Sequence, residues 1–345
     1  MSAAATATPL PGRLSQPFIA ADVGGTHVRV GLVQARAIAT PLQVLAYSKF
    51  RCADYAGLAD ILREFISGIA EAGGTGTVPA RVAVIASAGY PLADGTVITA
   101  NLPWPLSPAE IRRSLGLDTV HLVNDFEAVA HAVAHLGGNE VMQLAGPAAI
   151  APGPILVLGP GTGLGAAVWI PTASHPVVLA TEAGQAALAV GTGLEMALLQ
   201  QMLGQRSHVP VEHALSGPGL INLYNALCAV RGAAPVHSRP GEVTAAALAG
   251  ADPLARESLE VFCGLLGSIV GDMALLYGVR GVYLAGGILP HIREFLVGSD
   301  FVARFLNKGP MREALERVSV RLVEHGQLGV IGAASWYLGS GVTEK

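Results

Sequence analysis

The stretch DVGGTHVRVGLV, residues 22–33, begins with an aspartate and a tight bend of two glycines and a threonine. The run before it, PFIAADV at 17–23, is apolar, and after it apolar side chains occupy every second position from Val28 to Leu32. Such an alternation is typical of a β-strand. The stretch therefore predicts two strands joined by a glycine-rich bend.

A second bend of the same kind opens the other half of the chain. PILVLGPGTGLGAAVWI, residues 154–170, again places glycines and a threonine between two β-rich runs. Strand-like runs alternate with segments of helical periodicity along the chain, which indicates an α/β fold. The repeated hairpin predicts an internally duplicated architecture, and the segment at 144–154, rich in Gly, Ala and Pro, is the crossing between the halves that we expect.

Composition and charge narrow the classes of function. Of the 345 residues, 51% are hydrophobic and 13% are charged, which excludes disorder of the whole chain. The net charge of −4 provides no electrostatic footprint for nucleic acid or an anionic membrane, so we expect a small-molecule partner. Three cysteines without paired spacing indicate reduced thiols in a cytoplasmic protein.

Two segments resemble targeting or membrane signals only superficially. Residues 1–16 lack the apolar core of a secretory signal, so we expect a flexible tail. The apolar run at 261–279 contains Asp272 and several glycines, which favours a buried helix over a membrane span.

The glycine bends differ from the two most familiar phosphate loops. A P-loop needs a lysine after its last glycine, and the three lysines, Lys49, Lys308 and Lys345, lie away from both bends. A dinucleotide fingerprint opens a helix, whereas both bends here run on into β-rich residues. The remaining interpretations are an anion-binding nest of backbone N–H groups and an ordinary hairpin turn. Two such bends, one of them preceded by an acid, favour the nest.

Asp22 stands at the end of the first expected strand, directly before the first bend. Mg²⁺ prefers oxygen ligands and retains several waters, so we expect Asp22 to hold Mg²⁺ through water. Two facing nests would then grip the phosphates of a nucleotide from both sides.

A third polar site follows the strand-like run VHLVND, where Asn124 and Asp125 precede an expected helix at 126–136. Strand ends of this kind present side chains to a ligand crevice in α/β proteins. Asp125 is suited to be the base that accepts a proton from a substrate hydroxyl during phosphoryl transfer. It is equally suited to cap the helix, and the spacing alone leaves both roles open.

Four further polar side chains lie in apolar or glycine-rich surroundings and are candidates for binding sugar hydroxyls. They are Asn101, Glu182, Gln185 and Glu212. Each of them alone is more often a turn or capping residue. His131 and His135 are four apart on an expected helix and could bind a metal, but no HExxH pattern accompanies them, so we interpret them as partly exposed helix residues. His208 and His213 flank Glu212 without ligand-like spacing, and we assign no metal to them.

Taken together, six motifs resemble the bacterial glucokinases of the hexokinase and actin-like ATPase superfamily. They are DVGGT at 22–26, NLPW at 101–104, LVNDFEAVA at 122–130, GPGTGLG at 159–165, LSGPGLINLY at 215–224 and LAGGILP at 284–290. Their order and spacing match from about residue 17 to residue 340.

The resemblance implies a two-domain α/β fold of the actin-like ATPase (ribonuclease H-like) type with the active site in the inter-domain cleft. The expected parts are the tail at 1–16, a small domain at 17–135 plus 325–345, and a large domain at 136–324. It also implies a cytoplasmic homodimer that phosphorylates glucose at the 6-hydroxyl with ATP and Mg²⁺ and feeds glycolysis.

The resemblance implies a role for each residue that matches a functional position in one of the family's motifs. Asp125 resembles the general base, which favours catalysis over capping for this residue. The residues that resemble the family's hydroxyl-binding set are Asn101, Asn124, Glu182 and Glu212, with Gln185 at the position of a sugar-binding histidine. The residues that resemble the two phosphate loops and part of the base pocket are Gly24, Gly25, Thr26, Gly161, Thr162, Gly163, Gly286 and Gly287.

Three departures from the family pattern affect the expected sugar pocket. His27 stands where asparagine is usual, and the family's EGGH is here EAGQ, with Ala183 and Gln185. Gln185 exchanges hydrogen bonds but cannot ionise. We therefore expect an active kinase with altered sugar preference; the alternatives are a kinase for another hexose and a catalytically weak or inactive sugar-sensing paralogue, which fold alone does not exclude.

Overall fold

The computed structural model describes residues 16–35, 42–73, 80–91, 97–98, 102–133, 136–137, 140–173, 175–204, 206–324 and 326–339. The chain divides into two compact units, each described by itself. Unit 1 comprises residues 1–137, 172–178 and 325–345, and unit 2 comprises 138–171 and 179–324. The loop at 144–154, expected to cross between the halves, lies wholly within unit 2, where it joins two strands of one sheet.

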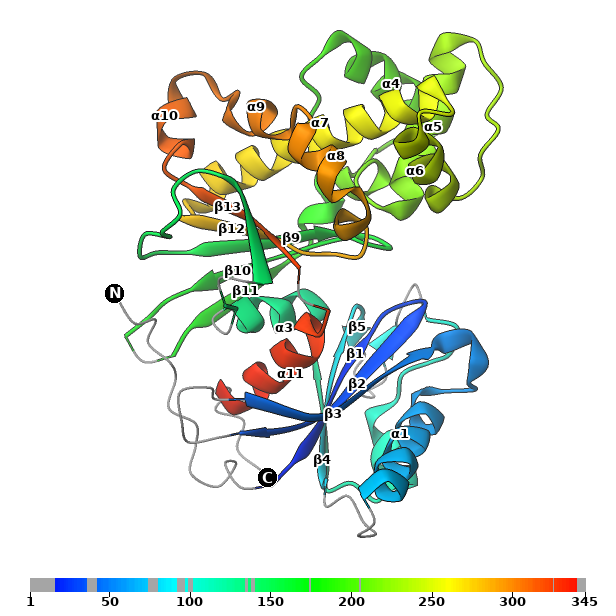
Figure 1. Ribbon diagram of the computed structural model, residues 1–345, viewed down its shortest axis with the longest axis vertical. Helices are drawn as coiled ribbons and strands as arrows, with labels where there is room; N and C mark the ends of the chain where they lie inside the picture. The colour runs from blue at the N-terminus through cyan, green and yellow to red at the C-terminus, as the bar shows by residue number, and fades with distance from the viewer. Residues whose placement is uncertain are drawn as a thin grey trace. The chain divides into compact units, whose positions relative to one another are not determined.

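Unit 1 is built on a five-stranded sheet of order β3-β2-β1-β4-β7 (Figure 1). Its strands are β1 (Phe18–Val23), β2 (His27–Ala35), β3 (Leu42–Arg51), β4 (Val82–Ser87) and β7 (Thr119–Val123). A two-stranded ribbon consists of β5 (Tyr90–Pro91) and β6 (Val97–Ile98). The helices are η1 (Cys52–Asp54), α1 (Leu58–Gly73), α2 (Pro108–Leu115), α3 (Asp125–Ala132) and α11 (Leu328–Gly339).

The alternation in β1 sorts its side chains to the two faces of this sheet. Ile19 and Ala21 join the apolar cluster under α1 and α2, whereas Phe18 and Ala20 join the cluster under α3 and α11. The C-terminal helix α11, red in Figure 1, packs along α3 and covers the central strands of the blue N-terminal sheet. Both faces are thus buried, which explains why β1 is almost uniformly apolar.

Unit 2 contains a six-stranded sheet of order β11-β10-β9-β12-β13-β8. Its strands are β8 (Val141–Ala145), β9 (Ile155–Pro160), β10 (Leu164–Ile170), β11 (Val177–Thr181), β12 (Gly281–Leu284) and β13 (Ser319–Val323). Its α-helices are α4 (Gly193–Leu203), α5 (Gly217–Arg231), α6 (Pro240–Ala249), α7 (Pro253–Tyr277), α8 (Arg293–Gly298), α9 (Phe301–Leu306) and α10 (Arg312–Leu315). Its short 3₁₀ turns are η4 (Ala183–Gln185), η5 (Val211–His213), η6 (Leu289–Ile292) and η7 (Gly309–Met311).

The two sheets repeat one topology, as the two hairpins predict. In unit 1, β1 pairs antiparallel with β2 and parallel with β4, and β4 pairs parallel with β7. In unit 2, β9 pairs antiparallel with β10 and parallel with β12, and β12 pairs parallel with β13. Each glycine bend therefore connects the central antiparallel pair of its own sheet.

The long apolar helix of unit 2 is α7. Its length and composition are sufficient to cross a membrane, but 72% of its most apolar stretch is buried inside the structure. It packs against α5, α6 and α9, and Phe262, Leu266 and Val270 are fully buried in the unit's core. This arrangement matches the core helix that the sequence favours.

Candidate active site

In unit 1, the parallel strands bring three predicted site segments to one edge of the sheet. The register aligns Asp22 of β1 with Ala86 of β4, and Ala86 with Val123 of β7. Asn124 and Asp125 follow directly after Val123. Neighbouring strands are about 4.8 Å apart, so Asp22, the first glycine bend and the start of α3 share the carboxyl edge of the sheet, where ligands bind in α/β folds.

Asp22 is largely buried and is paired with its cross-strand neighbour. Its Oδ2 accepts a hydrogen bond of 3.2 Å from Nη1 of Arg29, and its side chain is 22% exposed. Burial raises the pKa of Asp22, while the Arg29 guanidinium opposes this shift. Gly329, in the first turn of α11, lies against the Asp22 carboxyl group, where a β-carbon would collide with it. The carboxylate therefore has a defined position beside the first bend.

The first glycine bend is held in place by Cys52, which belongs to none of the six motifs. The backbone N–H of Cys52 donates to the carbonyl of Thr26 at 3.0 Å, and the Cys52 thiol donates to the carbonyl of Gly24 at 3.2 Å. Trp104 in turn donates from Nε1 to the Cys52 carbonyl at 3.4 Å. Cys52 is 1% exposed, and burial raises the pKa of its thiol, so the sulfur keeps its proton as a donor at neutral pH.

The start of α3 shows which residue caps the helix, a role that the spacing left open for Asp125. Asn124 is the N-cap residue: its Oδ1 accepts from the amides of Phe126 and Glu127, each at 3.0 Å. Asp125 is the first residue of the helix and is half-buried, and its Oδ1 accepts from the Phe126 amide at 2.9 Å. Because Asn124 caps α3, the helix does not depend on Asp125 for its cap.

In unit 2, the second glycine bend meets two other predicted segments. The amide of Gly161 donates to the carbonyl of Gly163, and the amide of Gly217, at the start of α5, donates to the carbonyl of Gly161, both at 2.8 Å. Gly286 follows β12 with a φ of +118°, and a β-carbon there would lie 2.5 Å from the Pro160 carbonyl. Only glycine allows β12 to end so close to the second bend.

The expected sugar-binding residues of unit 2 divide into a contacting pair and a separate glutamate. Gln185 donates from Nε2 to Oε1 of Glu212 at 2.8 Å, and the amide of Leu164 donates to Oε2 of Glu212 at 3.3 Å. Glu182 is exposed and is the residue before η4. Asn101 lies outside the described residues, so its role stays a prediction.

The residues that would hold Mg²⁺ are few. Among the residues that the structure describes, no group of three or more His, Cys, Asp or Glu side chains has the arrangement of a metal site. Asp22 provides a carboxylate beside the first glycine bend, and Glu212 provides one beside the second. This donor set fits a cation that keeps most of its waters and binds phosphate oxygens, which is how Mg²⁺ binds in nucleotide enzymes.

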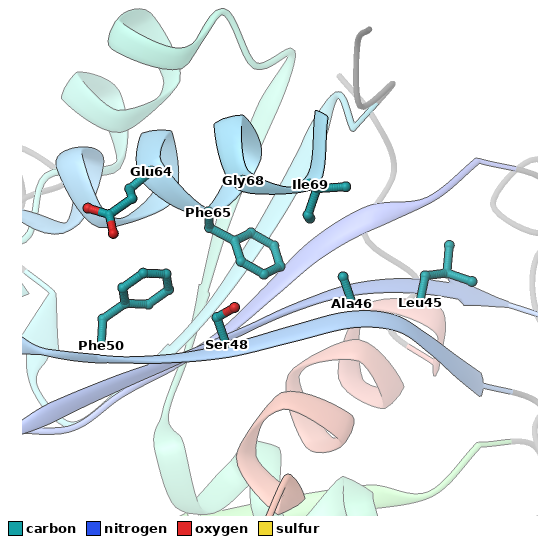
Figure 2. A pocket seen from close by; sticks show the side chains of 8 residues that line it. All are labelled: Leu45, Ala46, Ser48, Phe50, Glu64, Phe65, Gly68 and Ile69. Carbon is teal, nitrogen blue, oxygen red and sulfur yellow. The ribbon is translucent and has the colours of Figure 1, made fainter. Parts of the chain in front are cut away.

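A cavity in unit 1 lies away from these residues. It has a volume of about 550 Å³ and lies between β3 and α1, lined by Leu45, Ala46, Ser48, Phe50, Glu64, Phe65, Gly68 and Ile69 (Figure 2). The rings of Phe50 and Phe65 pack edge to face, with centroids 6.5 Å apart. Its lining is mainly apolar and includes none of the predicted site residues, so it contributes nothing to the candidate active site.

Comparison with known proteins decides the family. The sequence pattern of the family described as Glucokinase matches residues 19–339. The chain belongs to the glucokinase family. A glucokinase-like protein of Xylella fastidiosa strain 9a5c is 57% identical over 329 residues, covering 94% of this chain and 96% of the relative. A glucokinase of Paramagnetospirillum magneticum is 38% identical, covering 93% and 97%.

A solved structure agrees with the fold. The glucokinase of an Antarctic psychrotroph is 34% identical, with a TM-score of 0.79 over 93% of this chain and 98% of that one. The actin-like ATPase fold and the assignment as an enzyme of the glucokinase family are therefore confirmed. Membership of this family makes the chain a sugar kinase.

The structure of this glucokinase-family protein shows what surrounds two residues that depart from the family pattern, His27 and Ala183. His27 opens β2 opposite Arg51. Burial, followed by the positive charges of Lys49, Arg29 and Arg51, lowers the pKa of His27, so its imidazole is neutral at pH 7. Ala183 packs as a partly buried side chain against the apolar core of unit 2, so its extra carbon is accommodated by packing.

Two supporting residues of the site, Cys52 and Arg29, were missed by the reasoning from sequence. Arg29 stands at a polar position of the strand alternation at 28–32, and its place opposite Asp22 follows from pairing the two strands about the bend. Nothing in the sequence around Cys52 indicated its contact with Gly24, which lies 28 positions earlier in the chain.

Proposed function

We propose that this protein transfers the γ-phosphoryl group of ATP to the 6-hydroxyl of glucose, or of a close hexose, giving glucose 6-phosphate and ADP. The observation that carries the proposal is the convergence of Asp22, the first glycine bend and Asp125 on one edge of the unit 1 sheet. That edge combines phosphate-binding amides with a carboxylate suited to accept a proton.

The residues of unit 1 have distinct roles in this proposal. The glycine bend at Gly24, Gly25 and Thr26 binds phosphate through the backbone N–H groups of Gly25 and Thr26 and the threonine hydroxyl. The N–H of Gly24 closes the turn by donating to the carbonyl of His27 at 3.1 Å. Asp22 holds hydrated Mg²⁺, which neutralises phosphate charge when bound. Asp125 accepts the proton of the 6-hydroxyl as the oxygen attacks. The Oδ1 of Asn124 caps α3, which leaves its amide N–H groups for a sugar hydroxyl.

The predicted ligand-binding residues of unit 2 also have distinct roles in this proposal. Gly161, Thr162 and Gly163 bind phosphate at the second bend. Gly286, which lies close to Pro160 before that bend, and Gly287 contribute to the base pocket that the family resemblance implies. Glu182, Gln185 and Glu212 bind sugar hydroxyls. Asn101 is a further hydroxyl-binding residue that the family resemblance implies. We also infer, from the family resemblance, a cytoplasmic homodimer that acts in glycolysis.

A panel of hexoses tests this function. ADP production from ATP and Mg²⁺ is measured with glucose, mannose, fructose and N-acetylglucosamine. We expect turnover with glucose far above the others. Turnover with another hexose alone would reassign the substrate, and sugar binding without any turnover would favour the sugar-sensing alternative.

Restoring the family's histidine tests the role of Gln185 in the sugar pocket. If Gln185 weakens sugar binding relative to histidine, Gln185→His lowers the KM for glucose severalfold, because a hydrogen bond to a neutral partner contributes on the order of 1 kcal/mol. Steady-state kinetics at saturating ATP measure the effect. An unchanged or higher KM would show that the pocket has adapted to glutamine.

A further inference from the structure

One carboxylate in unit 2 connects two segments with different predicted ligands. Oε1 of Glu212 accepts from the side chain of Gln185 at 2.8 Å, on the sugar-binding side. Oε2 of the same carboxylate accepts from the amide of Leu164 at 3.3 Å. Leu164 is the residue that follows the second phosphate bend, so Glu212 spans from the sugar contacts to the nucleotide contacts.

The second bend is connected to Glu212 both directly and through the start of α5. A β-carbon on Gly163 would lie 2.8 Å from Oε2 of Glu212, which shows how closely the carboxylate approaches the bend. The backbone carbonyl of Glu212 accepts from the hydroxyl of Ser216 at 2.7 Å. Ser216 caps α5, whose first residue, Gly217, donates to Gly161 at 2.8 Å. Glu212 therefore holds the bend at Leu164 directly and at Gly161 through α5.

Gln185 contacts this carboxylate on the side away from the second bend. It belongs to η4, and its backbone carbonyl lies 3.0 Å from Nε2 of His208. Gln185 is exposed and Glu212 is half-buried, so a ligand can reach both side chains. A sugar hydroxyl that binds Glu212 must share the carboxylate with Gln185, and any displacement of the carboxylate acts on the Leu164 amide.

We propose that Gln185 is a positioning residue for the second phosphate bend, acting through Glu212, so that sugar binding and nucleotide binding are coupled within unit 2. The inference rests on the proposed function, because it takes a sugar as the ligand of Glu212 and a nucleotide as the ligand of the bend. Coupling between two sites is reciprocal, so each ligand changes the affinity for the other by the same factor.

The test measures ADP binding directly, by calorimetry with Mg²⁺, with and without saturating glucose. The wild-type protein is expected to bind ADP more tightly when glucose is present. Gln185→Leu removes the donor while keeping a side chain of similar size. We expect this variant to bind ADP about fivefold more weakly without glucose, as loss of a hydrogen bond to a charged group allows, and to lose most of the glucose effect.

Two further variants separate positioning from general damage. Gln185→Asn keeps the amide but shortens its reach, and it should reproduce the effect of Gln185→Leu. The same Gln→Leu change at Gln201, an exposed residue of α4, should leave ADP affinity and its glucose dependence unchanged. Thermal unfolding of all three variants should stay close to the wild type.

The outcomes distinguish this inference from the proposed function. If Gln185→Leu weakens glucose binding but leaves ADP affinity and its glucose dependence unchanged, Gln185 contacts sugar only and the inference is wrong. If the wild type phosphorylates no hexose while Gln185→Leu still weakens ADP binding in the absence of sugar, the bridge to the bend stands and the proposed reaction is wrong.

Discussion

Asp125→Asn is expected to lower kcat for glucose phosphorylation by a factor of about 10² to 10⁴, the usual contribution of a general base. Asparagine occupies nearly the same volume but cannot take the proton of the 6-hydroxyl. Because the cap of α3 is Asn124, the variant should fold and retain sugar affinity.

The same substitution at Asp118 provides a matched control. Asp118 precedes β7 and forms an exposed ion pair with Arg81 at 3.1 Å, and exposed pairs contribute little to stability. Asp118→Asn should therefore leave kcat and the melting temperature nearly unchanged. Initial rates and equilibrium glucose binding decide the assignment, and a kcat for Asp125→Asn within threefold of the wild type would refute it.

Arg304→Met is expected to lower the free energy of unfolding by about 3–5 kcal/mol, because it leaves a buried carboxylate without its partner. Arg304, on α9, donates to both carboxylate oxygens of Glu195 at 2.6 and 2.9 Å. Glu195 is 3% exposed and also accepts from the amides of Gly191 and Thr192 at the start of α4. Urea unfolding monitored by circular dichroism measures the loss.

The pH dependence of this pair has a definite sign. Burial alone would raise the pKa of Glu195, but the hydrogen bonds from Arg304, Gly191 and Thr192 together hold it below its usual value. A lowered folded-state pKa stabilises the protein above the unfolded-state pKa of about 4.3, and this contribution is lost as the pH falls through the folded-state value. The acid-side loss should be smaller in Arg304→Met.

Two comparisons check this interpretation. Arg312→Met breaks an exposed ion pair with Glu316 and should cost less than about 1 kcal/mol. The double variant Glu195→Leu/Arg304→Met removes both charges and should recover much of the stability lost in Arg304→Met. Equal losses in Arg304→Met and Arg312→Met would show that burial of the Glu195 pair has no special cost.

The parts of the fold that depend on local patterns were predictable. The glycine bends between alternating runs predicted the hairpins β1–β2 and β9–β10, and their repetition predicted the duplicated topology. Strand period and bend chemistry are properties of a few neighbouring residues, so a single sequence carries them. The segment at 144–154 was misassigned because a glycine-rich loop looks the same within a domain as between domains.

The contacts that support the site were not predictable in this way. Gln185 and Glu212 were each named as candidates, but their hydrogen bond joins residues 27 positions apart. The thiol of Cys52 meets Gly24 across 28 positions. Such contacts depend on how the loops pack in three dimensions, and no local spacing encodes them. The motifs thus name candidate residues, and the packing shows which of them contact one another.

The most direct test of the central claim is identification of the product formed from glucose, ATP and Mg²⁺. Phosphorus NMR of the reaction mixture, combined with oxidation by glucose-6-phosphate dehydrogenase, identifies the phosphorylated position and its yield. The account predicts one glucose 6-phosphate for each ADP, with neither product formed at an appreciable rate by Asp125→Asn. ADP release without a sugar phosphate, or phosphate on another hydroxyl, would contradict it.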